Sequence, residues 1–153
     1  MATCRGGLAA SRLELEITEG VLIDDTSRAL SVLLRLKALG VRIALDDFGK
    51  GYSSLSYLRA FTFDKIKIDR SFISDLATNH QSVVIVRTVI GLGRSLNIPV
   101  LAEGVETQAQ YDALAHEGCD EVQGYLTGRP LPIEDYASVV GRKVVARERA
   151  QAS

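Results

Sequence analysis

The sequence has few cysteines, almost no net charge and no long hydrophobic run, and each absence argues against a class of protein. The two cysteines, Cys4 and Cys119, lie far apart, which argues against a disulfide framework or a thiolate metal site and favours a reducing cytoplasm. With 18 basic and 19 acidic side chains the formal net charge is −1, so DNA, RNA and membrane surfaces have no general electrostatic attraction for the chain. The longest apolar stretch, residues 83–92, is interrupted by Arg87 and is shorter than the roughly 20 residues that insert across a bilayer.

The composition is that of one ordinary globular domain. Of the 153 residues, 46% are hydrophobic and 24% are charged, which excludes a disordered or collagenous chain. No low-complexity linker divides the sequence, so a second domain is not expected.

Strand and helix patterns alternate along the chain. Period-two alternation and apolar runs predict strands over residues 13–18, 41–46, 65–69, 98–102 and 121–124. Helical spacing predicts a helix that follows the capping residues 24–26 and stops at Gly40. Two helical stretches are predicted after the third strand, the second over residues 81–96, followed by helices over residues 108–116 and from residue 133. Between the second and third strands, a glycine-rich loop over residues 48–53 and a short helix over residues 54–58 are expected. The loop is either a mobile lid or a tight turn.

This order predicts an α/β fold with a parallel sheet, since a helix that crosses over between two strands returns the chain in the same direction. Two architectures remain open. An open doubly wound sheet of five strands suits the length. Part of an eight-stranded (β/α) barrel is the alternative, because a whole barrel needs about 250 residues.

Acidic residues lie at the ends of four predicted strands, and parallel strands bring those ends to one rim. The residues are Glu16, Glu19, Asp46, Asp47, Asp69, Glu103 and Glu106. Crowded carboxylates repel one another unless cations lie between them. Oxygen ligands without cysteine or a histidine cluster favour Mg²⁺ or Mn²⁺ over Zn²⁺. The alternative is a set of separate helix caps and solvated turns, which we accept for Asp24 and Asp25 but not for the pair Asp46 and Asp47.

Two lysines interrupt the third predicted strand, whereas strands of a parallel sheet are usually continuously apolar. An edge strand protected by lysines accounts for Lys65. Lys67 is nearer the acidic rim, where an ammonium could orient a water, assist its deprotonation or stabilise charge on a phosphate.

Five motifs occur in one order along the chain. They are LEITE at residues 15–19, DDFGKGYSSL at 46–55, KIKID at 65–69, AEGVET at 102–107 and QGYL at 123–126. Together they closely resemble the EAL-domain family of bacterial cyclic di-GMP phosphodiesterases. The resemblance implies a modified (β/α)8, TIM-like barrel, of which this chain would be the C-terminal five-strand portion. A partial EAL domain is then expected over residues 8–140, with an unstructured segment 1–7 and a basic helical or frayed tail 141–153.

The resemblance implies hydrolysis of cyclic di-GMP to linear pGpG at a two-metal site that binds Mg²⁺ or Mn²⁺. By motif, Glu16 resembles a ligand of one metal, Asp46 the bridging ligand, and Asp47 with Glu103 the ligands of the other. Lys67 resembles the lysine that contacts the nucleophilic water. Glu19 resembles a glutamate that steadies the loop after Asp47. Gln123 resembles a polar residue near the substrate, and Asp69 and Glu106 resemble supporting residues there.

The chain departs from the family at its beginning. The Glu-Ala-Leu signature is absent, together with a nearby substrate-contacting arginine and an asparagine of the first metal site. Loss of the leading strands would expose a sheet edge and an apolar barrel interior. We therefore expect either self-association or the missing N-terminal portion to complete the domain.

Three functions are consistent with these residues. The first is cyclic di-GMP hydrolysis. The second is a catalytically silent module that binds cyclic di-GMP or a partner protein. The third is a phosphoacceptor receiver domain, which also combines five parallel strands with an acidic pair and a lysine. A receiver places its acidic pair after the first strand, whereas Asp46 and Asp47 follow the second, so this function is disfavoured.

Overall fold

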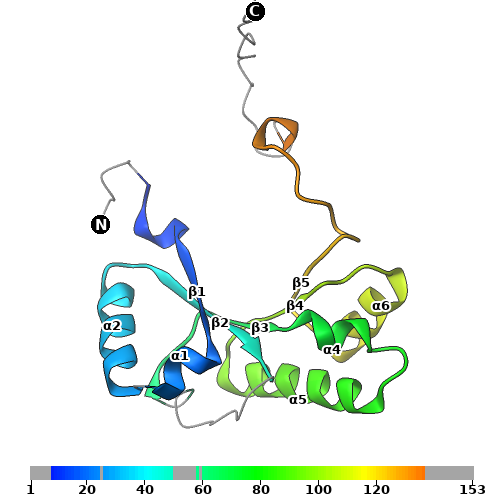
Figure 1. Ribbon diagram of the computed structural model, residues 1–153, viewed down its shortest axis with the longest axis horizontal. Helices are drawn as coiled ribbons and strands as arrows, with labels where there is room; N and C mark the ends of the chain where they lie inside the picture. The colour runs from blue at the N-terminus through cyan, green and yellow to red at the C-terminus, as the bar shows by residue number, and fades with distance from the viewer. Residues whose placement is uncertain (1–7, 25, 50–57, 59, 137–153) are drawn as a thin grey trace, which may run out of the picture.

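The centre of the structure is a five-stranded parallel sheet whose strands are arranged in the order of the sequence (Figure 1). The structure is a computed structural model, and it describes residues 8–24, 26–49, 58 and 60–136. The strands are β1 (Glu14–Thr18), β2 (Arg42–Phe48), β3 (Lys65–Ile68), β4 (Val100–Glu103) and β5 (Glu121–Gln123). Each pairs in parallel with the next, which confirms the predicted parallel α/β fold.

The strand order decides between the two candidate architectures. A doubly wound sheet, including that of a receiver domain, reverses its winding at a switch point, so its first strand lies inside the sheet. Here β1 and β5 form the two edges and β3 lies in the middle. Continuous winding in one direction is that of a (β/α) barrel. The sheet therefore has the order expected for part of a barrel.

The helices follow the predicted pattern, with one addition. They are α1 (Glu19–Asp24), α2 (Thr26–Ala38), α4 (Arg70–Ser74), α5 (His80–Leu96) and α6 (Gln108–Glu117), with 3-10 turns at Ala10–Arg12 and Ile133–Tyr136. The helix α1, directly after β1, was not expected. Among the described residues no helix is long and apolar enough to cross a membrane.

The ends of the helices agree with their sequence signals. Thr107 and Gln110 form a reciprocal capping box at the start of α6, and Gly118 ends this helix in the left-handed conformation. The terminal segments 1–7 and 141–153 and most of the expected loop and helix at 48–58 lie outside the described residues. Their predictions remain untested.

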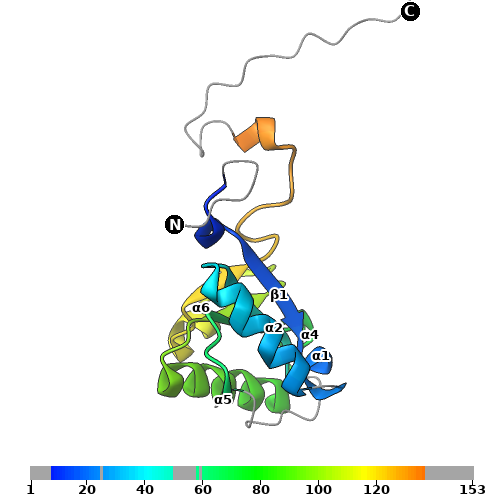
Figure 2. The ribbon, with the colours of Figure 1, turned by 90° about the vertical axis from the view of Figure 1, so that its left-hand side faces the viewer.

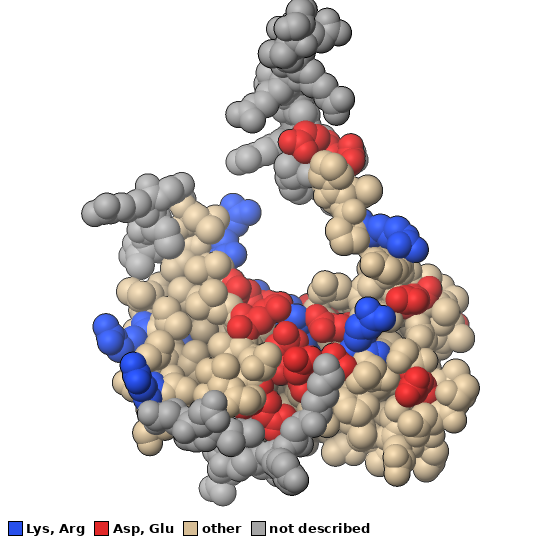
Figure 3. Space-filling model, viewed as in Figure 1, with Lys and Arg blue, Asp and Glu red and all other residues tan. Residues whose placement is uncertain are grey.

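The two faces of the sheet differ in polarity. Ile43, Leu45, Ile66 and Ile68 are fully buried in the hydrophobic core that includes residues of α5. Alternate positions on the opposite face carry charged side chains, and Figure 3 shows acidic residues gathered over the middle of the molecule. The expectation of an apolar barrel interior was therefore wrong for this face, because ion pairs take the place of the usual aliphatic layers.

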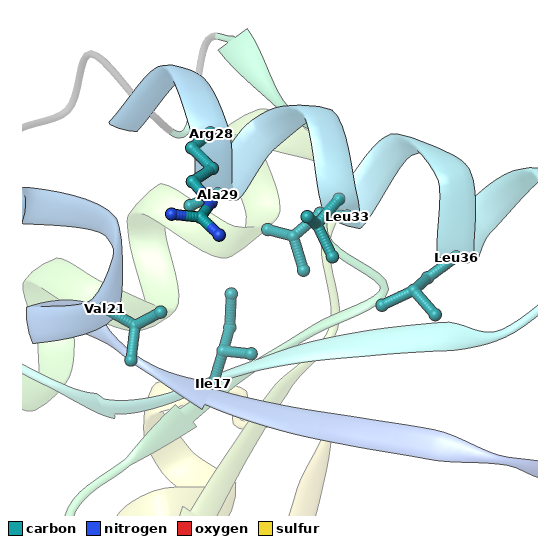
Figure 4. Close-up of a pocket in the computed structure, with 7 residues that line it drawn as sticks. Ile17, Val21, Arg28, Ala29, Leu33 and Leu36 are labelled. Atoms are coloured by element: carbon teal, nitrogen blue, oxygen red, sulfur yellow. The ribbon is translucent and has the colours of Figure 1, made fainter. Parts of the chain in front are cut away.

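Figure 2 shows the edge strand β1 beside α2. Exposed hydrophobic side chains of this part of the molecule include Val21, Val32 and Leu34. A groove of about 490 Å³ lies between β1, α1 and α2. Ile17, Val21, Leu33 and Leu36 point into it (Figure 4). Val21 is 55% exposed, so this edge of the sheet presents apolar surface to solvent.

Candidate active site

The buried ammonium of Lys67 lies at the centre of the predicted acidic rim. Its Nζ atom is 2.7 Å from Glu16 Oε1 and 2.7 Å from Glu103 Oε1, and 3.5 Å from Asp46 Oδ1. These carboxylates come from β1, β4 and β2, so four neighbouring strands contribute to one ionic cluster. Three of the predicted metal ligands and the predicted catalytic lysine are therefore brought together.

Lys67 is only 4% exposed, and its surroundings determine its charge. Burial disfavours the charged form, but hydrogen bonds to Glu103 and Glu16 outweigh this effect and raise the pKa of Lys67 well above its usual value. The ammonium is consequently a fixed positive charge among the carboxylates.

A bulge in β2 carries the acidic pair. The register between β2 and β3 shifts between Leu45 and Phe48, and Asp47 has a left-handed φ of 55°. The backbone N–H of Asp47 donates a hydrogen bond to Asp46 Oδ1 at 3.0 Å. Adjacent residues of a regular strand point to opposite faces, and a bulge breaks this alternation. The pair thus lies within the strand, not after it as predicted, and its two side chains are not constrained to opposite faces.

Two further predicted residues are buried beside the cluster's strands. Glu19 begins α1 immediately after β1 and is 4% exposed, and Asp69 follows β3 and is 5% exposed. Asp69 caps α4, since its Oδ1 accepts a hydrogen bond from the Ser71 backbone N–H at 2.8 Å. The buried carboxylate of Asp69 therefore has a structural role as the N-cap of α4.

The remaining predicted residues line a groove next to the cluster. This groove has a volume of about 210 Å³. It is lined by Arg70, Glu103, Gly104, Glu106, Gln123, Gly124 and Tyr125. Glu103 belongs to both the groove and the Lys67 cluster. Arg70 and Tyr125 are not among the predicted site residues, although Arg70 directly follows the KIKID motif and Tyr125 lies within QGYL.

Lys65 forms a second ionic cluster on the same face. Its Nζ lies 2.8 Å from Glu121 Oε2 and 3.6 Å from Glu14 Oε1, and Glu14 also pairs with Arg42 at 3.2 Å. The edge-strand interpretation of Lys65 was wrong, because β3 is the central strand and Lys65 is only 8% exposed. Spacing of two residues places Lys65 and Lys67 on one face of β3.

The donor atoms suit a hard divalent cation. Oxygens of Glu16, Glu103 and Asp46 surround a single ammonium, and carboxylate oxygens are the ligands that Mg²⁺ and Mn²⁺ prefer. Within the described ranges, no three acidic, histidine or cysteine side chains already form a group able to hold one metal ion. The carboxylate oxygens are therefore of the type that binds Mg²⁺ or Mn²⁺, but in this structure they contact the Lys67 ammonium.

Comparison with known sequences identifies the domain. Residues 2–130 match the model of the EAL domain. The chain is 61% identical over 128 residues to an "Uncharacterized signaling protein" of Caulobacter vibrioides, covering 84% of the chain and 16% of that protein. It is 45% identical over 139 residues to the "Bifunctional diguanylate cyclase/cyclic di-GMP phosphodiesterase MucR" of Pseudomonas aeruginosa, covering 91% of the chain and 20% of MucR. The chain thus spans a fifth or less of these relatives' length.

Solved structures agree in fold. The "PaMucR Phosphodiesterase, c-di-GMP complex" superposes with a TM-score of 0.83 at 46% identity, covering 86% of this chain and 53% of that one. A manganese/cyclic di-GMP complex of Klebsiella pneumoniae BlrP1 gives a TM-score of 0.75 at 38% identity, covering 81% and 32%. EAL domains form a TIM-like barrel, of which the present sheet is a five-strand portion. The chain belongs to the EAL-domain family.

Proposed function

We propose that this chain carries the metal- and phosphate-binding part of a cyclic di-GMP phosphodiesterase that produces linear pGpG. The observation that carries the proposal is the convergence of Glu16, Asp46 and Glu103 on the buried Lys67. Similarity to MucR and to the manganese/cyclic di-GMP complex of BlrP1 supports the same activity and a divalent metal. A cytoplasmic location is part of the proposal, because the low cysteine content favours a reducing compartment.

The acidic side chains are the proposed metal ligands. Glu16 would hold one ion, Asp47 with Glu103 would hold a second, and Asp46 would be a ligand of both. Two Mg²⁺ or Mn²⁺ ions held in this way would supply the Lewis acidity that activates a water and neutralises charge on the phosphodiester. The bulge at Asp46 and Asp47 supports this assignment, because it releases the pair from strand alternation.

Lys67 is the proposed catalytic cation. Its ammonium is buried, charged and held by Glu16 and Glu103 from opposite sides of β3. A group fixed in this way can orient a water and stabilise the charge that develops on phosphate oxygens in the transition state. Glu19 is proposed to steady the segment after Asp47. Gln123, Glu106 and Asp69 are proposed to support the substrate side, Asp69 through its cap of α4.

Completion of the domain is also part of the proposal. The chain corresponds to 53% of the MucR phosphodiesterase structure, and the β1 edge retains an apolar groove. Self-association or the remaining N-terminal portion of the domain is proposed to cover this edge.

Conversion of cyclic di-GMP to pGpG by the purified chain, with Mg²⁺ or Mn²⁺ and with a chelator as control, tests the proposed function. Metal-dependent product that disappears in Asp46→Asn is the expected result. The second candidate is a catalytically silent module that binds cyclic di-GMP. It is favoured by the finding that no three described acidic, histidine or cysteine side chains form a ready-made metal site. Binding without product from folded protein would select it.

A further inference from the structure

The ammonium of Lys67 occupies the point on which three of the proposed metal ligands converge. Glu16 Oε1 and Glu103 Oε1 each lie 2.7 Å from its Nζ atom, and Asp46 Oδ1 lies 3.5 Å away. A lysine ammonium has three N–H donors and no acceptor, so it can engage several carboxylates at once. The oxygens that would bind a metal are therefore directed at a cation that belongs to the protein.

Lys67 itself has little freedom to leave this position. It lies in β3, the central strand of the sheet, where it pairs with Leu101 of β4. Its neighbours Ile66 and Ile68 are fully buried in the hydrophobic core, and its own side chain is 6% exposed. The core thus anchors the ammonium, and a rearrangement of the cluster is expected to occur in the carboxylates.

The three carboxylates differ in how firmly they are held. The exposed fraction of the side chain is 50% for Glu16, 23% for Glu103 and 21% for Asp46. Asp46 Oδ1 also accepts a hydrogen bond from the Asp47 backbone N–H, which fixes this carboxylate independently of Lys67. Glu16 lies on the edge strand β1. Of the three, Glu16 is therefore the side chain that can turn away from the ammonium most readily.

A divalent cation and Lys67 require the same oxygens. Mg²⁺ needs oxygen ligands at 2.0–2.1 Å in nearly octahedral geometry, and two cations that share ligands repel each other. In the part of the chain that the structure describes, no three acidic, histidine or cysteine side chains already form a group able to hold one metal ion. The carboxylates at Lys67 are engaged with its ammonium instead. Metal binding therefore requires at least one ion pair of Lys67 to break.

We infer that Lys67 is a built-in competitor for the divalent cation, and that Glu16 exchanges its ammonium partner for the metal. The competition sets the metal affinity of the chain below the affinity that the carboxylates alone would have. The inference rests on the proposed function for the identity of the metal ligands. It concerns the metal-binding equilibrium, and so goes beyond the proposed action of Lys67 on water and phosphate.

Calorimetric titration of the full chain with Mn²⁺ compares the wild type with Lys67→Met, whose side chain is of similar length but uncharged. Lys67→Met should bind Mn²⁺ at least about 10-fold more tightly, because an ammonium beside a divalent ion repels it strongly even when solvent partly screens the charges. Lys67→Arg keeps the positive charge, so its affinity should stay close to that of the wild type. Lys65→Met is the matched control. It removes the other buried ammonium of β3, but Glu14 and Glu121 at Lys65 are not proposed ligands, so it should tighten binding less.

Nuclear magnetic resonance of the lysine ammonium groups provides a second test, on the wild type. Saturating Mg²⁺ should shift the ammonium signal of Lys67, which is identified by its loss in Lys67→Arg. The signal of Lys65, identified by its loss in Lys65→Met, should move less. This measurement decides the question if circular dichroism shows that Lys67→Met does not fold.

Three results would each overturn the inference. They are Mn²⁺ binding by folded Lys67→Met that is no tighter than in the wild type, an equal gain in Lys65→Met, and a Lys67 ammonium signal that Mg²⁺ leaves unchanged. Asp46→Asn and Glu103→Gln separate this inference from the proposed function. If neither weakens Mn²⁺ binding, the proposed metal ligands are wrong. If both weaken it while Lys67→Met does not strengthen it, the competition alone is contradicted.

Discussion

Lys65 and Lys67 lie on the same face of the central strand β3, and each is buried against carboxylates from strands on both sides. Lys65 contacts Glu14 of β1 and Glu121 of β5, and Lys67 contacts Glu16 of β1 and Glu103 of β4. The ion pairs of Lys65 and those of Lys67 therefore form two ionic layers, one above the other along β3. Only the layer nearer the carboxyl ends of the strands contains the predicted metal ligands, which is the end where barrel enzymes place their chemistry.

Replacement of Lys67 tests whether its ammonium group contributes to turnover of cyclic di-GMP. Lys67→Met should lower turnover of cyclic di-GMP by at least about 100-fold, because a positioned catalytic group contributes 10²–10⁴-fold. The effect is measured as the steady-state rate at saturating Mg²⁺. The assay uses the chain alone if it is active, or otherwise the domain completed by its N-terminal portion. Lys65→Met is the matched control, since it removes the neighbouring buried lysine of the same face. Equal losses of rate in the two folded variants would contradict a special role for Lys67.

Lys65 is expected to act on stability. Lys65→Met leaves Glu14 and Glu121 without their shared cation, but both carboxylates are partly exposed. Solvent therefore limits the loss of unfolding free energy to about 1–2 kcal/mol, below the cost for a fully buried pair. Urea unfolding measures it. A variant as stable as the wild type would mean that Arg42, which already pairs with Glu14, compensates fully.

Metal binding should depend on the carboxylates around Lys67. Asp46→Asn and Glu103→Gln are each expected to weaken Mn²⁺ binding at least about 10-fold, since each removes a charged oxygen ligand. Calorimetric titration of the folded chain with Mn²⁺ measures affinity without requiring turnover. Asp112→Asn provides the control, because Asp112 lies on the exposed surface of α6 and bonds Gln108. Unchanged affinity in both site variants would remove the metal assignment.

Two glycines of α5 should respond in opposite directions to alanine. A Cβ atom at Gly93 would lie 2.3 Å from Val100 Cγ2 and 2.8 Å from the Ile98 carbonyl oxygen, whereas one at Gly91 meets nothing within 4 Å. Gly93→Ala should cost about 2 kcal/mol of unfolding free energy through overpacking. Gly91→Ala should add about 0.5–1 kcal/mol by favouring the helix. Thermal and urea unfolding of the pair measure both, and a stabilising Gly93→Ala would contradict the tight packing of α5 on β4.

The apolar β1 edge should promote self-association of the isolated chain. Sedimentation velocity is expected to show dimers or larger species, and Val21→Glu should shift the distribution toward monomer by placing a charge in the groove. Val84→Glu is a control on α5, because Val84 is also exposed, at 48%, but lies outside this groove. A stable monomer at all concentrations would contradict the prediction.

Most of the fold could be predicted from local patterns. Glycine preference for the left-handed conformation predicts the end of α6 at Gly118. Residue alternation and apolar runs predict the five strands. Both signals act over a few residues. The helix α1 was missed because its six residues carry no long apolar period. The bulge was missed because the sequence around Asp47 resembles the end of a regular strand, whereas the left-handed φ of Asp47 and the shifted register with β3 are features of the folded backbone.

By itself the sequence determined the alternating α/β pattern, the five ordered motifs and the residue types of the site, because these depend on short-range order along the chain. It led to the wrong interpretation of Lys65 as a residue of an edge strand, whereas β3 is central and Lys65 is buried. Only the tertiary structure decided the sequential strand order, the separation of the lysines into two ionic layers, and the groove that joins Arg70 and Tyr125 to Glu103. The physical reason is that these relationships join residues far apart in sequence, and the pairing of parallel strands and the packing of helices on them bring such residues together.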